Sequence, residues 1–74
     1  IDVEYYQKRG CTEAQIKYIR LYVLTKKYRK AKPGSSIRNA VKIVYKDNKS
    51  TLGKWSENSL MKYYLLGENL HIDT

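Results

Sequence analysis

The sequence contains one cysteine, one histidine, one proline and no phenylalanine. The single cysteine, Cys11, excludes an internal disulfide and any zinc site with several cysteine ligands, and it fits a reducing compartment. No apolar run approaches the roughly 18 residues that cross a bilayer, and no signal peptide is recognisable. We therefore expect an intracellular location, in the cytoplasm or nucleoid or in a eukaryotic nucleus, and no membrane partner.

Residues that commonly carry catalysis are equally scarce. His71 has no cysteine or second histidine nearby with which to share a metal, and no histidine lies near Cys11 in the sequence to activate it as a nucleophile. The four glycines are scattered, so there is no glycine-rich phosphate loop. The sequence predicts no catalytic residue, metal, cofactor or small-molecule ligand, and the protein is predicted not to be an enzyme.

Seventy-four residues suit one domain, residues 1–74, with a thin hydrophobic core. A chain of this size buries only about 60% of the surface that its unfolded form exposes. Dimerisation or attachment to a larger chain would add the missing burial, so a homodimer is one expected partner. The first residue is Ile1 rather than methionine, which suggests a fragment or a processed product.

Positive charge is abundant and unevenly distributed. Fifteen Lys and Arg face seven Asp and Glu, a net charge of +8, and residues 17–32 contain no acidic residue. The acidic residues lie mostly towards the ends of the chain, among them Asp2, Glu4, Glu13, Glu68 and Asp73. This pattern favours a nucleic-acid partner. An acidic protein, a membrane surface and plain solubility are the alternatives.

Local signals predict two helices in the first half of the chain. Asp2 can cap a short helix over residues 3–9, which Gly10 can end. Thr12 and Gln15 form a capping-box pattern at the start of a helix that should run to about Arg29. Two adjacent apolar stripes on this second helix are formed by Ile16, Ile19 and Val23 and by Leu21, Leu24 and Tyr28. Pro33 and Gly34 should then turn the chain.

The second half is more ambiguous. Ser35 or Ser36 can cap a helix whose apolar residues recur at helical spacing: Ile37, Ala40, Val41, Val44 and Tyr45. Val41, Ile43 and Tyr45 also alternate like a strand, so a hairpin at 40–55 and a winged helix are the alternative.

The last predicted helix covers residues 57–66. Ser56 is its expected cap, Gly67 its expected end, and the tail 68–74 is expected to be loose. The favoured fold class is all-α, a small trihelical bundle with a short leading helix.

The basic run after residue 25 is the best candidate for a binding surface. Clustered Lys and Arg gain affinity by neutralising phosphates and releasing their counterions, and hydroxyls or a helix start can add contacts to phosphate oxygens. The residues predicted to contact nucleic acid in this way are Lys26, Lys27, Arg29, Lys30, Lys32, Ser35, Ser36, Arg38, Lys42 and Lys62.

Eight tyrosines accompany these cations. Tyr22, Tyr28, Tyr45 and Tyr64 fit the core or its rim. Four others have no evident place in the predicted core, and unpaired bases or a dimer contact could use them: Tyr5, Tyr6, Tyr18 and Tyr63.

Residues 55–63, Trp-Ser-Glu-Asn-Ser-Leu-Met-Lys-Tyr, resemble the recognition helix of homeodomains, whose pattern is Trp-Phe-x-Asn-Arg-Arg. Trp55 matches the core tryptophan, Asn58 the adenine-reading asparagine and Lys62 a later basic residue. The second helix is similar to the family's first helix at Thr12, Gln15, Ile19, Val23 and Tyr28. The resemblance implies a helix-turn-helix domain in which Asn58 contacts a base in the major groove.

The sequence departs from the homeodomain pattern at several positions. Ser59 and Leu60 replace the two arginines, Gly53 would fall inside the family's recognition helix, and Asp2 and Glu4 stand where a basic arm would be. The chain looks more similar to the divergent, dimerising domains of bacteriophage replication-organiser proteins, which bind DNA with little sequence preference. Double-stranded DNA is the expected partner, in replication or in the regulation of transcription, and RNA or single-stranded DNA are alternative nucleic-acid partners. The alternative is a protein-interaction module that docks an acidic partner.

Overall fold

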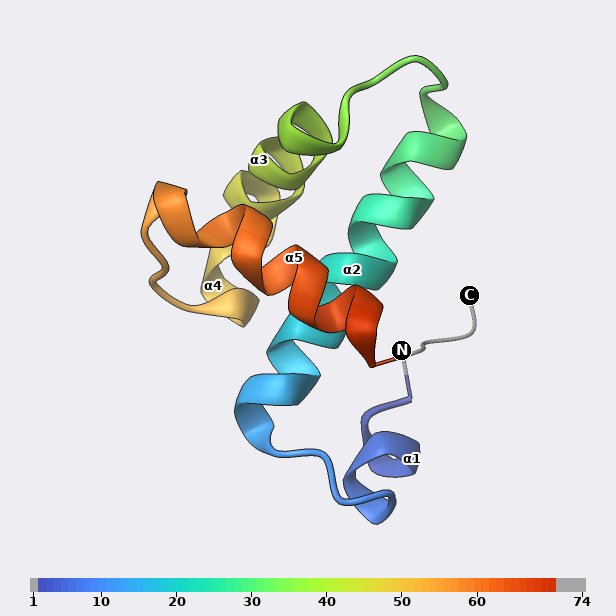
Figure 1. The fold of residues 1–74 in the computed structure, drawn as a ribbon, viewed down its shortest axis with the longest axis vertical. Coiled ribbons are helices and arrows are strands. Elements are labelled where there is room, and N and C mark those ends of the chain that lie inside the picture. The colour runs from blue at the N-terminus through green and yellow to red at the C-terminus, as the bar shows by residue number, and fades with distance from the viewer. Residues whose placement is uncertain (1, 71–74) are drawn as a thin grey trace.

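The structure is a computed structural model and describes residues 2–70. These residues form helices joined by short connections (Figure 1). The elements in chain order are α1 (Val3–Lys8), α2 (Glu13–Ala31), α3 (Ile37–Asp47), α4 (Lys49–Leu52), the 3₁₀ turn η1 (Glu57–Ser59) and α5 (Leu60–Asn69). No strand occurs among residues 2–70, so the all-α fold class is confirmed.

The alternative of a hairpin at 40–55 is wrong, because this segment is helical as far as Leu52. Val41 and Val44, three positions apart, are both buried, whereas Ile43, which would share a strand face with Val41, is only half-buried. Asn48, expected in a hairpin turn, instead caps the end of α3, where its side-chain amide donates to the Val44 carbonyl at 2.9 Å. Burial at helical spacing therefore outweighs the strand-like alternation.

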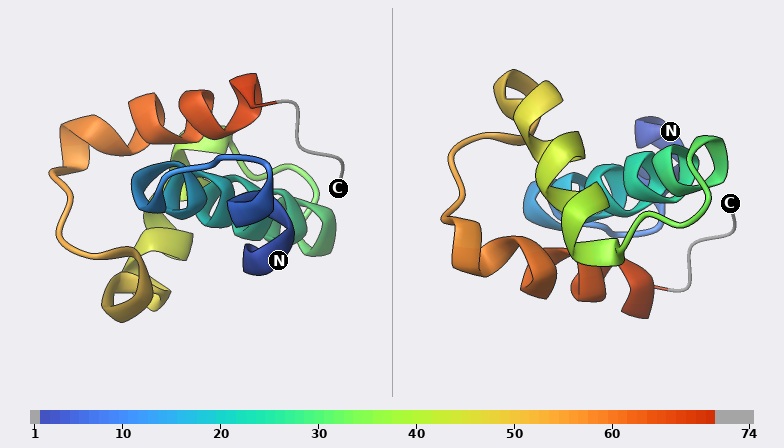
Figure 2. Two further views of the ribbon diagram at one scale, coloured as in Figure 1. Left: turned by 90° about the horizontal axis from the view of Figure 1, so that it is seen from below. Right: turned by 90° about the horizontal axis from the view of Figure 1, so that it is seen from above.

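The long helix α2 forms the centre of the fold. In Figure 1, α3 lies beside α2 after the turn at residues 32–36, and α5 crosses over α2. Figure 2 shows α5 on one side of α2 and α1 near another. Side chains from four helices make the core between them: Leu21, Tyr22, Val41, Val44, Leu52, Leu60 and Tyr64.

The predicted start of α2 is confirmed in detail. The Gln15 backbone N–H donates to the Thr12 hydroxyl at 3.2 Å, and the Thr12 backbone N–H donates to the Gln15 side-chain oxygen at 2.7 Å. Each bond satisfies an N–H that the first turn of a helix leaves without a partner. The helix continues to Ala31, slightly beyond the expected end at Arg29.

The last helix differs from the prediction at both ends. The Ser56 side chain makes no capping bond to the backbone; its hydroxyl lies 2.7 Å from that of Ser59, and the first turn is 3₁₀. Gly67 does not end the helix, because α5 runs through it to Asn69, and Gly67 is buried. Residues 68 and 69, expected in a loose tail, are therefore helical, and residues 71–74 lie outside the described part of the chain.

Aromatic rings fix the connection between α4 and α5. The ring of Trp55 stacks on Tyr45 at 5.8 Å and lies 4.7 Å from Tyr63, which itself stacks on Tyr18 at 4.8 Å. The Tyr45 hydroxyl accepts from the Trp55 N–H and donates to the Gly53 carbonyl, both at 2.8 Å. Tyr18 and Tyr63, which had no evident place in the sequence, thus belong to the rim of the core.

Candidate nucleic-acid interface

Four of the predicted cations line one groove between α1 and the C-terminal half of α2. The groove has a volume of about 790 Å³ and ends at the turn of Pro33 and Gly34. Its basic lining residues are Lys26, Lys27, Arg29 and Lys30. Asp2 is the acidic residue in the lining, and its carboxylate accepts a hydrogen bond from the Tyr5 backbone N–H at 3.1 Å.

The sequence places these cations by leaving them off the buried face of α2. Tyr22 and Thr25 face the core, whereas Lys26, Lys27 and Lys30 are exposed. Arg29 is half-buried, and its Nε donates to the Ser35 carbonyl oxygen at 3.4 Å, which ties the helix end to the following turn. Cations in the last turns of a helix are also stabilised by the negative end of the helix dipole.

Two lysines of this region rest on tyrosine rings. The Lys26 ammonium lies 5.6 Å from the centre of the Tyr22 ring, and the Lys32 ammonium lies 5.5 Å from that of Tyr28. Contacts of this kind hold an ammonium near an aromatic face while leaving it hydrated. Unlike Lys26, Lys32 follows the last residue of α2 and does not line the groove.

Two of the groove cations, Lys26 and Arg29, also influence the pKa of Tyr64 on α5. Burial raises the pKa of the Tyr64 hydroxyl, and the negative charge of Glu68 raises this pKa further. Lys26 and Arg29 act in the opposite direction, and the net pKa shift is still upward. Tyr64 is therefore a neutral hydroxyl at physiological pH and takes no charge away from the cations.

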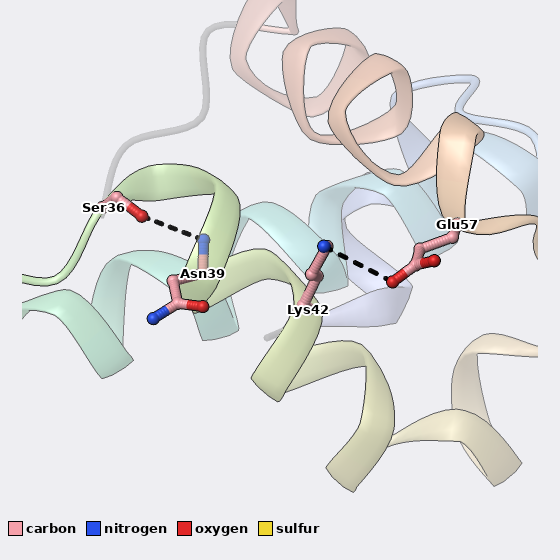
Figure 3. A network of polar contacts seen from close by, with 4 residues as sticks. All are labelled: Ser36, Asn39, Lys42 and Glu57. Carbon is pink, nitrogen blue, oxygen red and sulfur yellow. Dashed lines mark hydrogen bonds and ion pairs between the residues drawn. The ribbon is translucent and has the colours of Figure 1, made fainter.

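A second group of predicted residues meets between α3 and the start of α5. Arg38, Lys42 and Asn58 line a smaller cavity of about 210 Å³ together with Glu57. The Lys42 ammonium pairs with the Glu57 carboxylate at 3.4 Å, as Figure 3 shows. This ion pair cancels one of the two positive charges of the cavity, so the second group carries less net positive charge than the groove.

The remaining predicted residues, Ser35, Ser36 and Lys62, line neither the groove nor the smaller cavity. The Ser36 hydroxyl accepts from the Asn39 backbone N–H at 3.2 Å and so caps α3 (Figure 3). That N–H is occupied by the cap and cannot also donate to a phosphate. Ser35 is half-buried in the turn, and Lys62 is exposed on α5 and lines neither cavity.

Asn58 lies outside the regular part of the last helix. The resemblance to homeodomains implies an asparagine within a recognition helix, whereas here Asn58 is exposed in the 3₁₀ turn η1. A separate helix, α4, and an extended connection precede this turn, and Gly53 ends α4 with a φ of 92°. The reading of adenine by Asn58 therefore stays a prediction.

The sequence offered Tyr5 and Tyr6 for contacts with unpaired bases or a second copy of the chain, but it did not place them in a groove beside the cations. Both lie on α1, and their rings meet edge to face at 5.1 Å. No residue of this short helix is buried, which the structure shows and the sequence pattern does not. An adjacent pair of tyrosines on such a helix has to face either solvent or a groove.

Neither a cluster of metal-ligating residues nor a helix long and apolar enough to cross a membrane occurs among residues 2–70. Among residues 2–70, no cluster of three or more His, Cys, Asp or Glu residues could hold a metal ion. His71, which has no cysteine or second histidine nearby in the sequence, lies outside this range. Within the same range, no helix combines the length and the apolar character that crossing a membrane requires.

Comparisons of the chain with protein-family models, with curated proteins and with solved structures find no match in any of the three.

Proposed function

We propose that this domain binds nucleic acid, with double-stranded DNA as the expected form, mainly through phosphate contacts from the basic side chains of α2. The observation that carries this proposal is the gathering of Lys26, Lys27, Arg29 and Lys30 along one groove. The role is one of binding rather than catalysis.

The charge of this surface is not neutralised within the described part of the chain. The ion pair of Lys42 with Glu57 is the only one among residues 2–70, while the whole chain carries a net charge of +8. A phosphate backbone supplies the missing negative charges, and each neutralised phosphate releases counterions into solution. The positive face therefore gains more free energy from a polyanion than from isolated surface ion pairs.

The proposal is tested by fluorescence anisotropy of blunt-ended duplexes of several sequences, titrated at a series of salt concentrations. The test variant is Lys27→Gln/Lys30→Gln, and the control is Lys46→Gln/Lys49→Gln, which removes the same charge from exposed positions outside the groove. Each groove lysine should lower the slope of log affinity against log salt by about 1 on every sequence.

The result that would overturn the proposal is an unchanged slope in the groove variant, or the same loss in both variants. Absence of binding at roughly 50 mM salt, where contacts with several phosphates are strong, would overturn it as well. The partner would then be an acidic protein, the second candidate, because the same exposed lysines can also pair with carboxylates.

A further inference from the structure

The groove between α1 and α2 combines a basic surface with an aromatic one. Binding to the phosphate backbone of a duplex requires only the basic surface. Basic side chains from α2 form one wall, and Tyr5 and Tyr6 from α1 contribute aromatic rings. Its volume of about 790 Å³ lies in the range of sites that enclose small organic groups, roughly 300–1,000 Å³. A groove of this size can accept a flat ring as well as a phosphate.

Tyr5 offers the ring surface. It is 47% exposed, although Tyr6 contacts it edge to face and the Arg9 guanidinium lies over the ring, 5.0 Å from its centre, so that a base would stack on the face opposite Arg9. These two contacts restrict the position of the ring, and its backbone N–H is held by the Asp2 carboxylate. A restricted, exposed aromatic ring is a surface on which a nucleobase can stack with little loss of side-chain entropy.

The cations extend from this ring along α2. Lys26 and Lys30 are one helical turn apart, about 6 Å along the helix axis, and Lys27 lines the same groove from a neighbouring position of the helix. Cations spaced in this way follow a chain of phosphates rather than a single anion. The groove therefore pairs one ring with several phosphate contacts.

We infer that this groove takes an unpaired nucleotide at the end of a nucleic-acid strand, with its base against Tyr5 and its phosphates along Lys26, Lys27 and Lys30. The inference rests on the proposed function and adds to it the form of the ligand. Bases inside a duplex are stacked on their neighbours and cannot reach Tyr5, whereas an unpaired base has a free face.

The test compares a blunt duplex with the same duplex that carries a short unpaired extension, at fixed salt. The variants are Tyr5→Ala and Tyr5→Phe, and Leu65→Ala is a control that removes an exposed apolar side chain on α5. The native protein should prefer the extended duplex by about tenfold, the loss expected when one stacking ring is removed. Tyr5→Ala should abolish this preference, and Tyr5→Phe and Leu65→Ala should keep it.

A competition with the extended duplex distinguishes base stacking from simple anion binding. The competitors are deoxythymidine monophosphate and inorganic phosphate at equal charge and ionic strength. The nucleotide should displace the extended duplex at a lower concentration than phosphate, and Tyr5→Ala should remove the difference. Equal displacement by the two competitors would overturn the inference, because it would leave the ring without a role.

Folding defects and failures of the broader proposal give different results. No side chain of α1 is buried, so Tyr5→Ala should leave the melting temperature unchanged. Salt-dependent binding of the blunt duplex without a preference for the extension would overturn this inference while the proposed function stands. A polyglutamate peptide that binds with the same dependence on Tyr5 would overturn the inference in favour of a protein partner.

Discussion

Gly67 sets how closely α5 approaches α2. A Cβ atom at this position would lie 2.6 Å from the Tyr18 carbonyl oxygen and 2.9 Å from the Tyr22 Cβ. Both neighbours belong to the backbone or to the first atom of a side chain, so neither can rotate away. Only a shift of α5 away from α2 could make room for a larger residue.

We predict that Gly67→Ala destabilises the domain by up to about 2 kcal/mol, because overpacking costs about 1–3 kcal/mol and the better helix propensity of alanine returns about 1. Urea denaturation followed by circular dichroism measures the change in the free energy of unfolding. Asn69→Ala, at an exposed position of the same helix, is the control and should change this free energy by less than about 0.5 kcal/mol. A more stable Gly67→Ala variant would contradict the close helix contact.

Gly67 also illustrates where sequence reasoning fails at the residue scale. A glycine near the end of a helical pattern usually marks its C-terminal cap, so the sequence predicted an end there. Here the glycine is needed because α2 passes close by, and the neighbours in question, Tyr18 and Tyr22, are far away in the sequence. Local patterns cannot carry that information. The capping box of Thr12 and Gln15 was predictable because both partners lie within one helical turn.

At the scale of elements, Tyr45 couples α3 to the connection between α4 and α5. Its hydroxyl bonds to the Gly53 carbonyl and to the Trp55 N–H, and its ring stacks on Trp55. The connection, residues 53–56, has no regular secondary structure of its own. These contacts therefore determine where the start of α5, including Asn58, is placed.

We predict that Tyr45→Phe lowers the free energy of unfolding by about 1–2 kcal/mol, because a half-buried N–H and a carbonyl lose their partner. It should also shift the fluorescence of Trp55, the only tryptophan, to longer wavelength as the connection loosens and water enters. Tyr28→Phe, on α2, is the control and should leave the emission of Trp55 unchanged. Unaltered stability and emission in Tyr45→Phe would show that the ring stack alone positions the connection.

The elements differed in how far the sequence could predict them. The apolar spacing of α2 and α3 settles their class, because Ile16, Ile19, Val41 and Val44 are all buried on helical faces. The short helix α4 and the turn η1 were not predictable, since neither has enough residues for a periodic pattern. The basic residues of the site were predictable from the run on α2. The groove was not, because it depends on the docking of α1 beside that helix.

For the whole molecule, electrostatics should act on folding and on binding with opposite signs. The net charge of +8 lies within a radius of gyration of 11.7 Å, close to the Debye length of about 10 Å at 0.1 M salt. At low salt the positive charges therefore repel one another across the domain. The single ion pair among residues 2–70 is exposed on both sides and contributes little against this repulsion.

We predict that raising sodium chloride from roughly 50 to 500 mM increases the melting temperature while it weakens binding to DNA, because salt screens the internal repulsion and also competes for the phosphates. The salt is sodium chloride because sulfate and phosphate are excluded from the protein surface, and this exclusion stabilises the folded state independently of charge screening. Lys46→Gln/Lys49→Gln, which lowers the net charge outside the groove, should raise the melting temperature at low salt and have a smaller effect at high salt. A melting temperature that falls as sodium chloride is added would contradict the prediction, since it would mean that attraction between opposite charges outweighs the repulsion in the folded state.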